Sequence, residues 1–184
     1  MTHRFELATD RLLLRDFVEE DHLATNEYER DPNVVRYQGH GTRTLEESLD
    51  YIRRVIEESQ AYPRRLYDLA VVLREEARVV GRCGLNLSAG PNQDAALWYV
   101  LHPRLWGKGI IVEAARALVT FGFRELGLHR VWIDCDPENH ASARVAEKLG
   151  MRREAHMREN VWFRDRWVDT FIYAVLDRDW PPPP

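Results

Sequence analysis

The segment RLWGKGIIVEAARALVTFGF (residues 104–123) joins a strand-like segment to a long stretch with helical apolar periodicity. Gly107 and Gly109 stand just before Ile110, where the helix is expected to begin. Glycine weakens a helix, but it permits backbone angles closed to other residues and lets a ligand approach bare N–H groups. The first N–H groups of a helix are unpaired and carry a positive partial charge. This junction therefore predicts an anion site that suits a phosphate or a pyrophosphate.

Two common nucleotide-binding motifs do not describe this junction. A P-loop needs a glycine five residues before Gly107 and a Ser or Thr after Lys108, and neither is present. A dinucleotide fingerprint needs a third glycine where Val112 stands. The alternative is an ordinary strand-to-helix turn that holds two glycines. If the anion site is real, Arg104 and Lys108 can add positive charge to it.

The bulk composition limits the classes of function. The chain has 184 residues, a formal net charge of −4, 45% hydrophobic and 30% charged residues. These values fit one soluble globular domain over residues 1–184, with residues 181–184 as a frayed tail. A nucleic-acid partner would require a basic surface, and no apolar run is long enough to span a membrane. Without a signal peptide, and with Cys83 and Cys135 in apolar runs, we expect a cytoplasmic protein with reduced thiols.

Apolar periodicity and turn residues divide the chain into helices and strands. Helices are expected over residues 19–31, 45–60, 110–125 and 141–149. Strands are expected over residues 11–18, 67–75, 78–88, 95–103, 129–137, 152–163 and 167–176. Short links predict an antiparallel meander in the middle of the chain, and the strand–helix–strand unit after it predicts one parallel pair. The expected fold class is α/β, a mixed and mostly antiparallel sheet with helices on both faces.

The helix over residues 45–60 carries its own start signal. Thr44 and Glu47 have the spacing of a capping box. One apolar stripe is expected to hold Leu45, Leu49, Ile52 and Ile56.

The spacing Arg104-x-x-Gly107-x-Gly109 at a strand-to-helix junction resembles motif A of the GNAT superfamily of acyl-CoA-dependent N-acyltransferases. Four segments are similar to its ribosomal-protein N-terminal acetyltransferase (RimJ/RimL-like) branch, and they cover most of the chain in the right order: TDRLLLRDFVEED, WYVLHPRLWGKGIIVEAARALVTFGFRELGLHRV, DPENHASARVAEKLGM and WVDTFIYAVLDRDW. The resemblance implies the GNAT fold. In that fold the strand before motif A and the strand after its helix splay apart, and the arm of acetyl-CoA lies between them.

The resemblance also implies a cofactor site. The backbone of Tyr99, Val100 and Leu101 would pair with the pantetheine amides. Asn139, in the motif DPENHAS, would contact the cofactor arm, and it also suits a helix N-cap. Arg144 and Lys148 would approach the 3′-phosphate or form a solvated helix face. The pyrophosphate would be held by the segment made of Arg104, Leu105, Trp106, Gly107, Lys108, Gly109 and Ile110.

The implied reaction is transfer of the acetyl group to the neutral primary amine of a protein N-terminus or a small molecule. An N–H group of Val100 or Leu101 would stabilise the oxyanion. Ser142 would act as the acid or bind the departing thiolate. The base stays unassigned among four candidates, which are Asp134, Tyr37, His40 and Glu46. Asp134 is favoured as a catalytic residue because it lies on the splayed strand, nearer the chemistry, although this carboxylate could equally pair with an arginine.

Two positions depart from the family pattern. Ala146 stands where many members carry a tyrosine acid, and Ala96 stands where some carry a glutamate base. These departures leave open a slow enzyme, a base that acts through water, or a regulatory module that binds acyl-CoA with little or no turnover. A separate alternative is an interaction protein that has lost cofactor binding. No metal is expected, because the seven histidines lack ligand spacing and the two cysteines form no CxxC.

The acceptor side is less defined by the sequence. In the family, the segment DPNVVRYQGHGTRTLEES (residues 31–48) helps to wall the acceptor site. The late aromatic residues form core, line the acceptor pocket or contact a second copy in a homodimer; they are Trp162, Phe163, Trp167, Phe171 and Tyr173. No charge feature identifies the amine.

Overall fold

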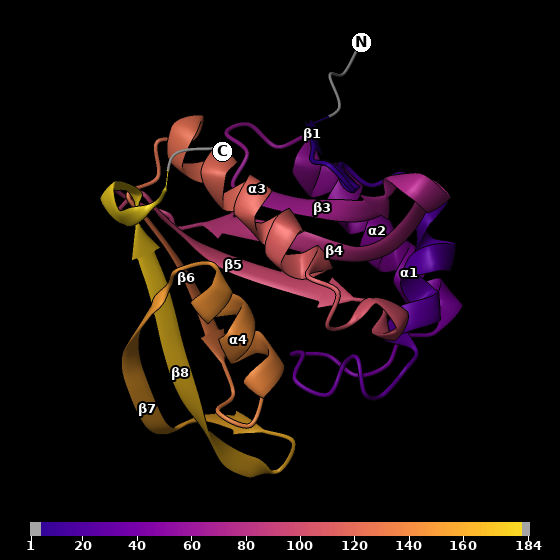
Figure 1. Cartoon of the computed structure of the whole chain (residues 1–184). Coiled ribbons are helices and arrows are strands. Elements are labelled where there is room, and N and C mark those ends of the chain that lie inside the picture. The colour runs from indigo at the N-terminus through magenta and orange to yellow at the C-terminus, as the bar shows by residue number, and fades with distance from the viewer. Residues whose placement is uncertain (1–4, 182–184) are drawn as a thin grey trace.

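The computed structural model describes residues 5–181, which form an eight-stranded sheet with helices on both faces (Figure 1). The strand order is β1-β2-β3-β4-β5-β6-β8-β7, and β5 and β6 are its parallel pair. This confirms the expected fold class. Apart from Pro181, the expected frayed tail lies outside the described residues.

The strands are β1 (Glu6–Ala8), β2 (Leu12–Arg15), β3 (Leu66–Leu73), β4 (Arg78–Leu87), β5 (Asp94–Leu101), β6 (Arg130–Cys135), β7 (Arg152–Phe163) and β8 (Arg166–Leu176). The α-helices are α1 (Asp21–Glu29), α2 (Leu45–Ser59), α3 (Ile110–Arg124) and α4 (His140–Lys148). Three short 3-10 turns are η1 (Arg74–Glu76), η2 (Pro103–Leu105) and η3 (Asp177–Asp179). The sequence did not predict β1 or these turns, because segments of three residues carry too little periodicity.

Alternation along β3 explains why both faces of the sheet are covered. Leu69 and Val71 belong to the larger core, which α3 and α4 complete, whereas Ala70 and Val72 face α2. In Figure 1, α3 crosses in front of the sheet and α2 lies behind β3 and β4. Trp180 packs against the larger core, and its Nε1 donates to Thr120 Oγ1 of α3 at 2.9 Å.

The start of α2 confirms one prediction and corrects another. Thr44 and Glu47 form both hydrogen bonds of a capping box. Leu45, however, is 50% exposed and does not belong to the buried stripe. The buried residues of the helix are instead Ser48, Ile52 and Val55. Ile52 and Val55 pack against the sheet, whereas Ser48 Oγ accepts a hydrogen bond from Asn26 Nδ2 of α1 at 3.1 Å.

A buried ion-pair cluster joins α1 and α2 to the sheet. Its members are Glu29, Tyr51, Asp68 and Arg82. Arg82 Nε donates to Glu29 Oε1 at 2.7 Å, and its Nη1 lies 3.6 Å from Asp68 Oδ2. Asp68 is 3% exposed, and its Oδ1 has no hydrogen-bond partner among the described residues. Burial therefore raises the pKa of Asp68 to about 6, although Arg82 and Tyr51 oppose the shift.

Replacing Asp68 with Asn is expected to change how stability depends on pH. The pKa of Asp68 is higher in the folded protein than in the unfolded chain, so its contribution is fully present below about pH 4 and is lost as pH rises through about 6. Relative to Asp68→Asn, the wild type should lose about 3 kcal/mol of unfolding free energy between pH 4 and pH 7. Denaturant unfolding across this range measures it. The exposed Asp10→Asn is the control, and identical slopes for Asp68→Asn and wild type would contradict the assignment.

Candidate functional site

β5 and β6 pair at one end only. The paired residues are Asp94 with Arg130, Ala95 with Val131 and Ala96 with Trp132. Beyond Ala96, β5 stays paired with β4, while β6 stays paired with β8. Figure 1 shows the two arrows diverging from this point. The sheet is therefore opened along residues 97–101.

The backbone of β5 alternates between β4 and this opening. The His102 N–H donates to the Val80 carbonyl on the β4 side at 2.8 Å. Because successive residues of a strand direct their N–H and C=O groups to opposite sides, Val100 also faces β4. Tyr99 and Leu101 face the opening, and the Leu101 carbonyl accepts a hydrogen bond from Trp106 Nε1 at 2.9 Å. The opening is thus bordered by backbone groups that β6 does not pair.

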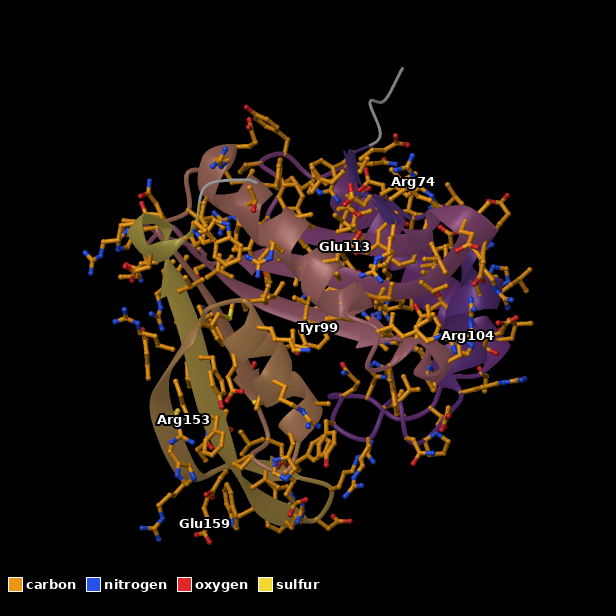
Figure 2. The ribbon with its side chains drawn as sticks, in the orientation of Figure 1. Arg74, Tyr99, Arg104, Glu113, Arg153 and Glu159 are labelled. Carbon is orange, nitrogen blue, oxygen red and sulfur yellow. The ribbon has the colours of Figure 1, made fainter. Side chains whose placement is uncertain are left out.

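A cavity of about 830 Å³ fills the opening. Its walls are β5, the turn before α3, α4 and the loop over residues 31–38. Figure 2 shows Tyr99 where β5 faces α4. Of the residues expected to bind a cofactor, the cavity is lined by Tyr99, Val100, Leu101, Leu105, Trp106, Gly107, Gly109, Ile110, Asn139 and Ser142. Arg144 and Lys148 of α4 line it as well.

The two glycines before α3 adopt the left-handed conformation. Gly107 has φ 74° and Gly109, the N-cap of α3, has φ 76°. Side chains other than glycine's are strained at such angles. Apart from Gly107 and its two chain neighbours, no heavy atom of the described residues lies within 4 Å of where a Gly107 Cβ would stand, and Gly107 lines the cavity. The geometry suits close approach of an anion to the first N–H groups of α3.

Arg104 and Lys108, which could add positive charge to an anion site at this turn, both lie outside the cavity lining. Arg104 pairs with Glu76 of η1, with Nη1 to Oε1 at 2.8 Å, and it does not line the cavity. Figure 2 places Arg104 far to the right of Tyr99. The positively charged residues that line the cavity are Arg36, Arg144 and Lys148.

A clasp formed by Thr9, Arg11 and Glu113 fixes the turn from the other side. Arg11 Nη1 donates to the Lys108 carbonyl at 3.1 Å, and Arg11 Nε donates to Glu113 Oε2 at 2.6 Å. Thr9 Oγ1 donates to Glu113 Oε1 at 2.6 Å. Burial raises the pKa of Glu113, but these hydrogen bonds outweigh it and lower the pKa overall. No local sequence pattern predicts this contact, because it joins residues 102 positions apart.

The start of α4 brings two hydroxyl groups together. Asn139 Oδ1 accepts the Ser142 N–H at 3.2 Å, which confirms the predicted N-cap. Ser142 is 7% exposed, and its Oγ lies 2.8 Å from the Tyr99 hydroxyl. The family resemblance implied a role for the backbone of Tyr99 only. The alternation of β5 could have placed its side chain on the same face as Leu97 and Leu101, beneath the last helix.

The four candidate bases, all within the described residues, occupy different places. Tyr37 lines the cavity and its hydroxyl donates to the Glu138 carbonyl at 3.3 Å. Asp134 is exposed and outside the cavity lining, since Cys135 and not Asp134 faces the larger core. His40 Nε2 lies 3.2 Å from Arg82 Nη2, and burial lowers its pKa. Glu46 is exposed in the first turn of α2.

The acceptor-side segment contributes its first part to the cavity, from Asp31 to Gln38. Arg164, in the hairpin between β7 and β8, donates to the Val35 carbonyl at 2.9 Å and braces this loop. The late aromatic residues divide into two groups. Phe171 and Tyr173 pack in or against the larger core, whereas Trp162 and Trp167 are 58% and 57% exposed and meet edge to face.

Within residues 5–181, no group of three or more His, Cys, Asp and Glu side chains is arranged to hold a metal ion. Over the same residues, no helix is long and apolar enough to cross a membrane.

Comparisons with known proteins agree with this geometry. The acetyltransferase (GNAT) domain family matches residues 11–152. The chain is 33% identical over 175 residues to the uncharacterized N-acetyltransferase YnaD of Bacillus subtilis (strain 168), covering 95% of this chain and 98% of the relative. It is 24% identical over 188 residues to the [ribosomal protein uS5]-alanine N-acetyltransferase of Escherichia coli (strain K12), covering 97% and 94%. The crystal structure of a GNAT-family acetyltransferase from Bacillus anthracis superposes with a TM-score of 0.84 at 30% identity, covering 95% and 99%.

Replacing Gly107 with Val is expected to weaken binding of acetyl-CoA at least tenfold. The change forces a branched side chain into a left-handed conformation that costs about 1–2 kcal/mol, and it fills cavity space. Calorimetric titration measures the affinity. Gly127→Val is the matched control, because Gly127 has φ 64° and the same open surroundings but lies outside the cavity lining. Unchanged affinity for Gly107→Val would contradict the anion site.

Removing the clasp with Arg11→Ala is expected to weaken acetyl-CoA binding about fivefold, because a half-exposed ion pair contributes about 1 kcal/mol to holding the turn. The same titration applies. Arg53→Ala, which removes the exposed pair with Glu19 on α2, should leave the affinity unchanged. Equal affinities for Arg11→Ala and Arg53→Ala would show that the clasp does not order the turn.

Proposed function

This chain belongs to the GNAT acetyltransferase family and transfers an acetyl group from acetyl-CoA to an amine, and we propose that the amine is that of a protein N-terminus or a small molecule. The observation that carries the proposal is the opening between β5 and β6. Its cavity connects the N-terminus of α3, which suits an anion, with the loop over residues 31–38 on the acceptor side.

The residues around the opening fit a CoA-type ligand. In the turn over residues 105–110, the N–H groups of Leu105, Trp106 and Lys108 already donate to backbone carbonyls. Those of Gly107, Gly109 and Ile110 would therefore hold the pyrophosphate. Arg144 and Lys148 would lie near the 3′-phosphate. The backbone of Tyr99 and Leu101 would pair with the pantetheine amides, as a neighbouring strand would. Asn139 would add a side-chain contact from α4.

The chemistry requires a stabilised oxyanion. The nitrogen lone pair of the amine attacks the thioester carbonyl, and negative charge develops on the carbonyl oxygen. The N–H of Leu101 faces the opening, whereas that of Val100 faces β4, so we assign the oxyanion contact to Leu101. The departing sulfur would lie toward α4, beside Ser142.

The attacking amine must be neutral and must lose a proton. An α-amino group has a pKa near ~8, against ~10.4 for lysine, so an N-terminal amine needs less help from the protein. Asp134, one of the four candidate bases, lies outside the cavity lining and would act through water. Tyr37 lines the cavity and is the alternative base.

A protein N-terminus is the first acceptor to test. The E. coli relative is named for acetylating an alanine of a ribosomal protein. The resemblance to the RimJ/RimL-like branch points the same way. The proposed location is the cytoplasm, supported by two free and buried cysteines, Cys83 and Cys135. A homodimer contact through Trp162 and Trp167 is supported by their exposure.

A thiol-release assay with a panel of amines tests the proposal. We expect CoA release with peptides that have a free α-amine, and a rate that rises through about pH 8 as the amine loses its proton. The matched control is the same peptide with an acetylated N-terminus and an intact lysine. Amino acids, polyamines and aminoglycosides complete the panel. Binding of acetyl-CoA with no CoA release for any amine would contradict the proposal and favour a regulatory module.

A further inference from the structure

The last helix lacks the tyrosine that many family members use as an acid, and Ala146 stands there fully buried. We propose that Tyr99 of β5 supplies the missing hydroxyl group, and that Tyr99 and Ser142 together donate a hydrogen bond to the departing sulfur. This inference rests on the proposed function. It assigns a catalytic side chain to a residue that was expected to act through its backbone.

The position of the two hydroxyl groups carries the proposal. Tyr99 comes from β5 and Ser142 from the first turn of α4, so they stand on facing walls of the opening. Their oxygens are 2.8 Å apart, and both residues line the cavity. The Tyr99 hydroxyl also lies 3.4 Å from the Ser142 carbonyl. The two hydroxyl groups therefore connect β5 to the first turn of α4 across the opening.

The hydrogen count of the pair gives it a free donor. Each hydroxyl has one hydrogen, and one of these two hydrogens is used between the two oxygens. Whichever residue donates internally, the hydroxyl of the other keeps a hydrogen. Its nearest acceptors in the structure are the Ser142 carbonyl, 3.4 Å from the Tyr99 oxygen, and the Cys135 sulfur beside Ser142, and it can turn from these toward a ligand. The CoA sulfur can accept this hydrogen, because it gains negative charge as the thioester C–S bond breaks.

The Tyr99 hydroxyl stays protonated during this reaction. Burial raises its pKa above the ordinary tyrosine value, although the hydrogen bond with Ser142 opposes the shift. A group with a raised pKa is a poor proton donor to a thiolate. Tyr99 therefore stabilises the thiolate by hydrogen bonding and does not lose its proton outright.

The reaction balances with this role. The N–C bond forms and the C–S bond breaks, and the electron pair of the C–S bond goes to sulfur. The proton that the attacking nitrogen loses passes to the base or to water. The thiolate is held by the O–H···S hydrogen bond until it takes a proton from solvent and leaves as CoA. Neither Tyr99 nor Ser142 changes its covalent state.

Replacing Tyr99 with Phe tests the assignment, because it keeps the ring and removes the hydroxyl. We expect kcat to fall about tenfold to a hundredfold, with the KM for acetyl-CoA within twofold of wild type. Ser142→Ala should give a similar loss, and the double variant should lose little more than either single one, because the two hydroxyls act as one unit. Tyr173→Phe, a buried tyrosine of the same core outside the cavity lining, is the control.

A binding measurement separates this inference from the proposed function. At pH 9, CoA carries a large thiolate fraction, whereas desulfo-CoA has no sulfur. Tyr99→Phe should weaken CoA binding several-fold and leave the affinity for desulfo-CoA unchanged. Equal effects on the two ligands, or none on either, would overturn the role of Tyr99 even if wild type acetylates amines. If wild type releases no CoA with any amine, the proposed function fails, and the comparison of the two ligands still decides whether the pair binds sulfur.

Discussion

Strand β5 loses one of its two neighbours after Ala96, and the rest of the site follows from this loss. Backbone N–H and C=O groups inside a protein need partners, so an unpaired strand edge is stable only where a ligand or water can meet it. The helix α4 covers one side of the opening, and the turn before α3 closes one end. The unpaired backbone groups of β5 can form hydrogen bonds with an extended ligand that carries several amide groups.

The opening brings three kinds of group to one place. The N-terminus of α3 offers N–H donors with a positive dipole end, and β5 offers backbone groups in strand geometry. The pair of Tyr99 and Ser142 adds two neutral hydroxyls from opposite walls. None of these groups needs a metal or a free charge, which suits a reaction that moves an acyl group between a thiol and an amine.

The sequence predicted the parts of the site that depend on neighbouring residues. The two glycines before α3, the capping box of α2 and the N-cap at Asn139 are local patterns with one structural outcome. Contacts between distant residues could not be read in this way. Tyr99 and Ser142 are 43 positions apart, and the pairing of Arg104 with Glu76 depends on how a turn directs one side chain. Leu45 matched the helical period, but it is half exposed in the folded protein.

Helix α3 is fastened on both sides by residues far from it in the sequence. Glu113 in its first turn is held by Thr9 and Arg11, and Thr120 farther along accepts a hydrogen bond from Trp180. During synthesis, residue 180 leaves the ribosome long after α3 has emerged. Because Trp180 lies beyond β8, this second contact forms only after every strand of the sheet has been synthesised. Helix α3 thus joins the beginning and the end of the described chain beside the opening.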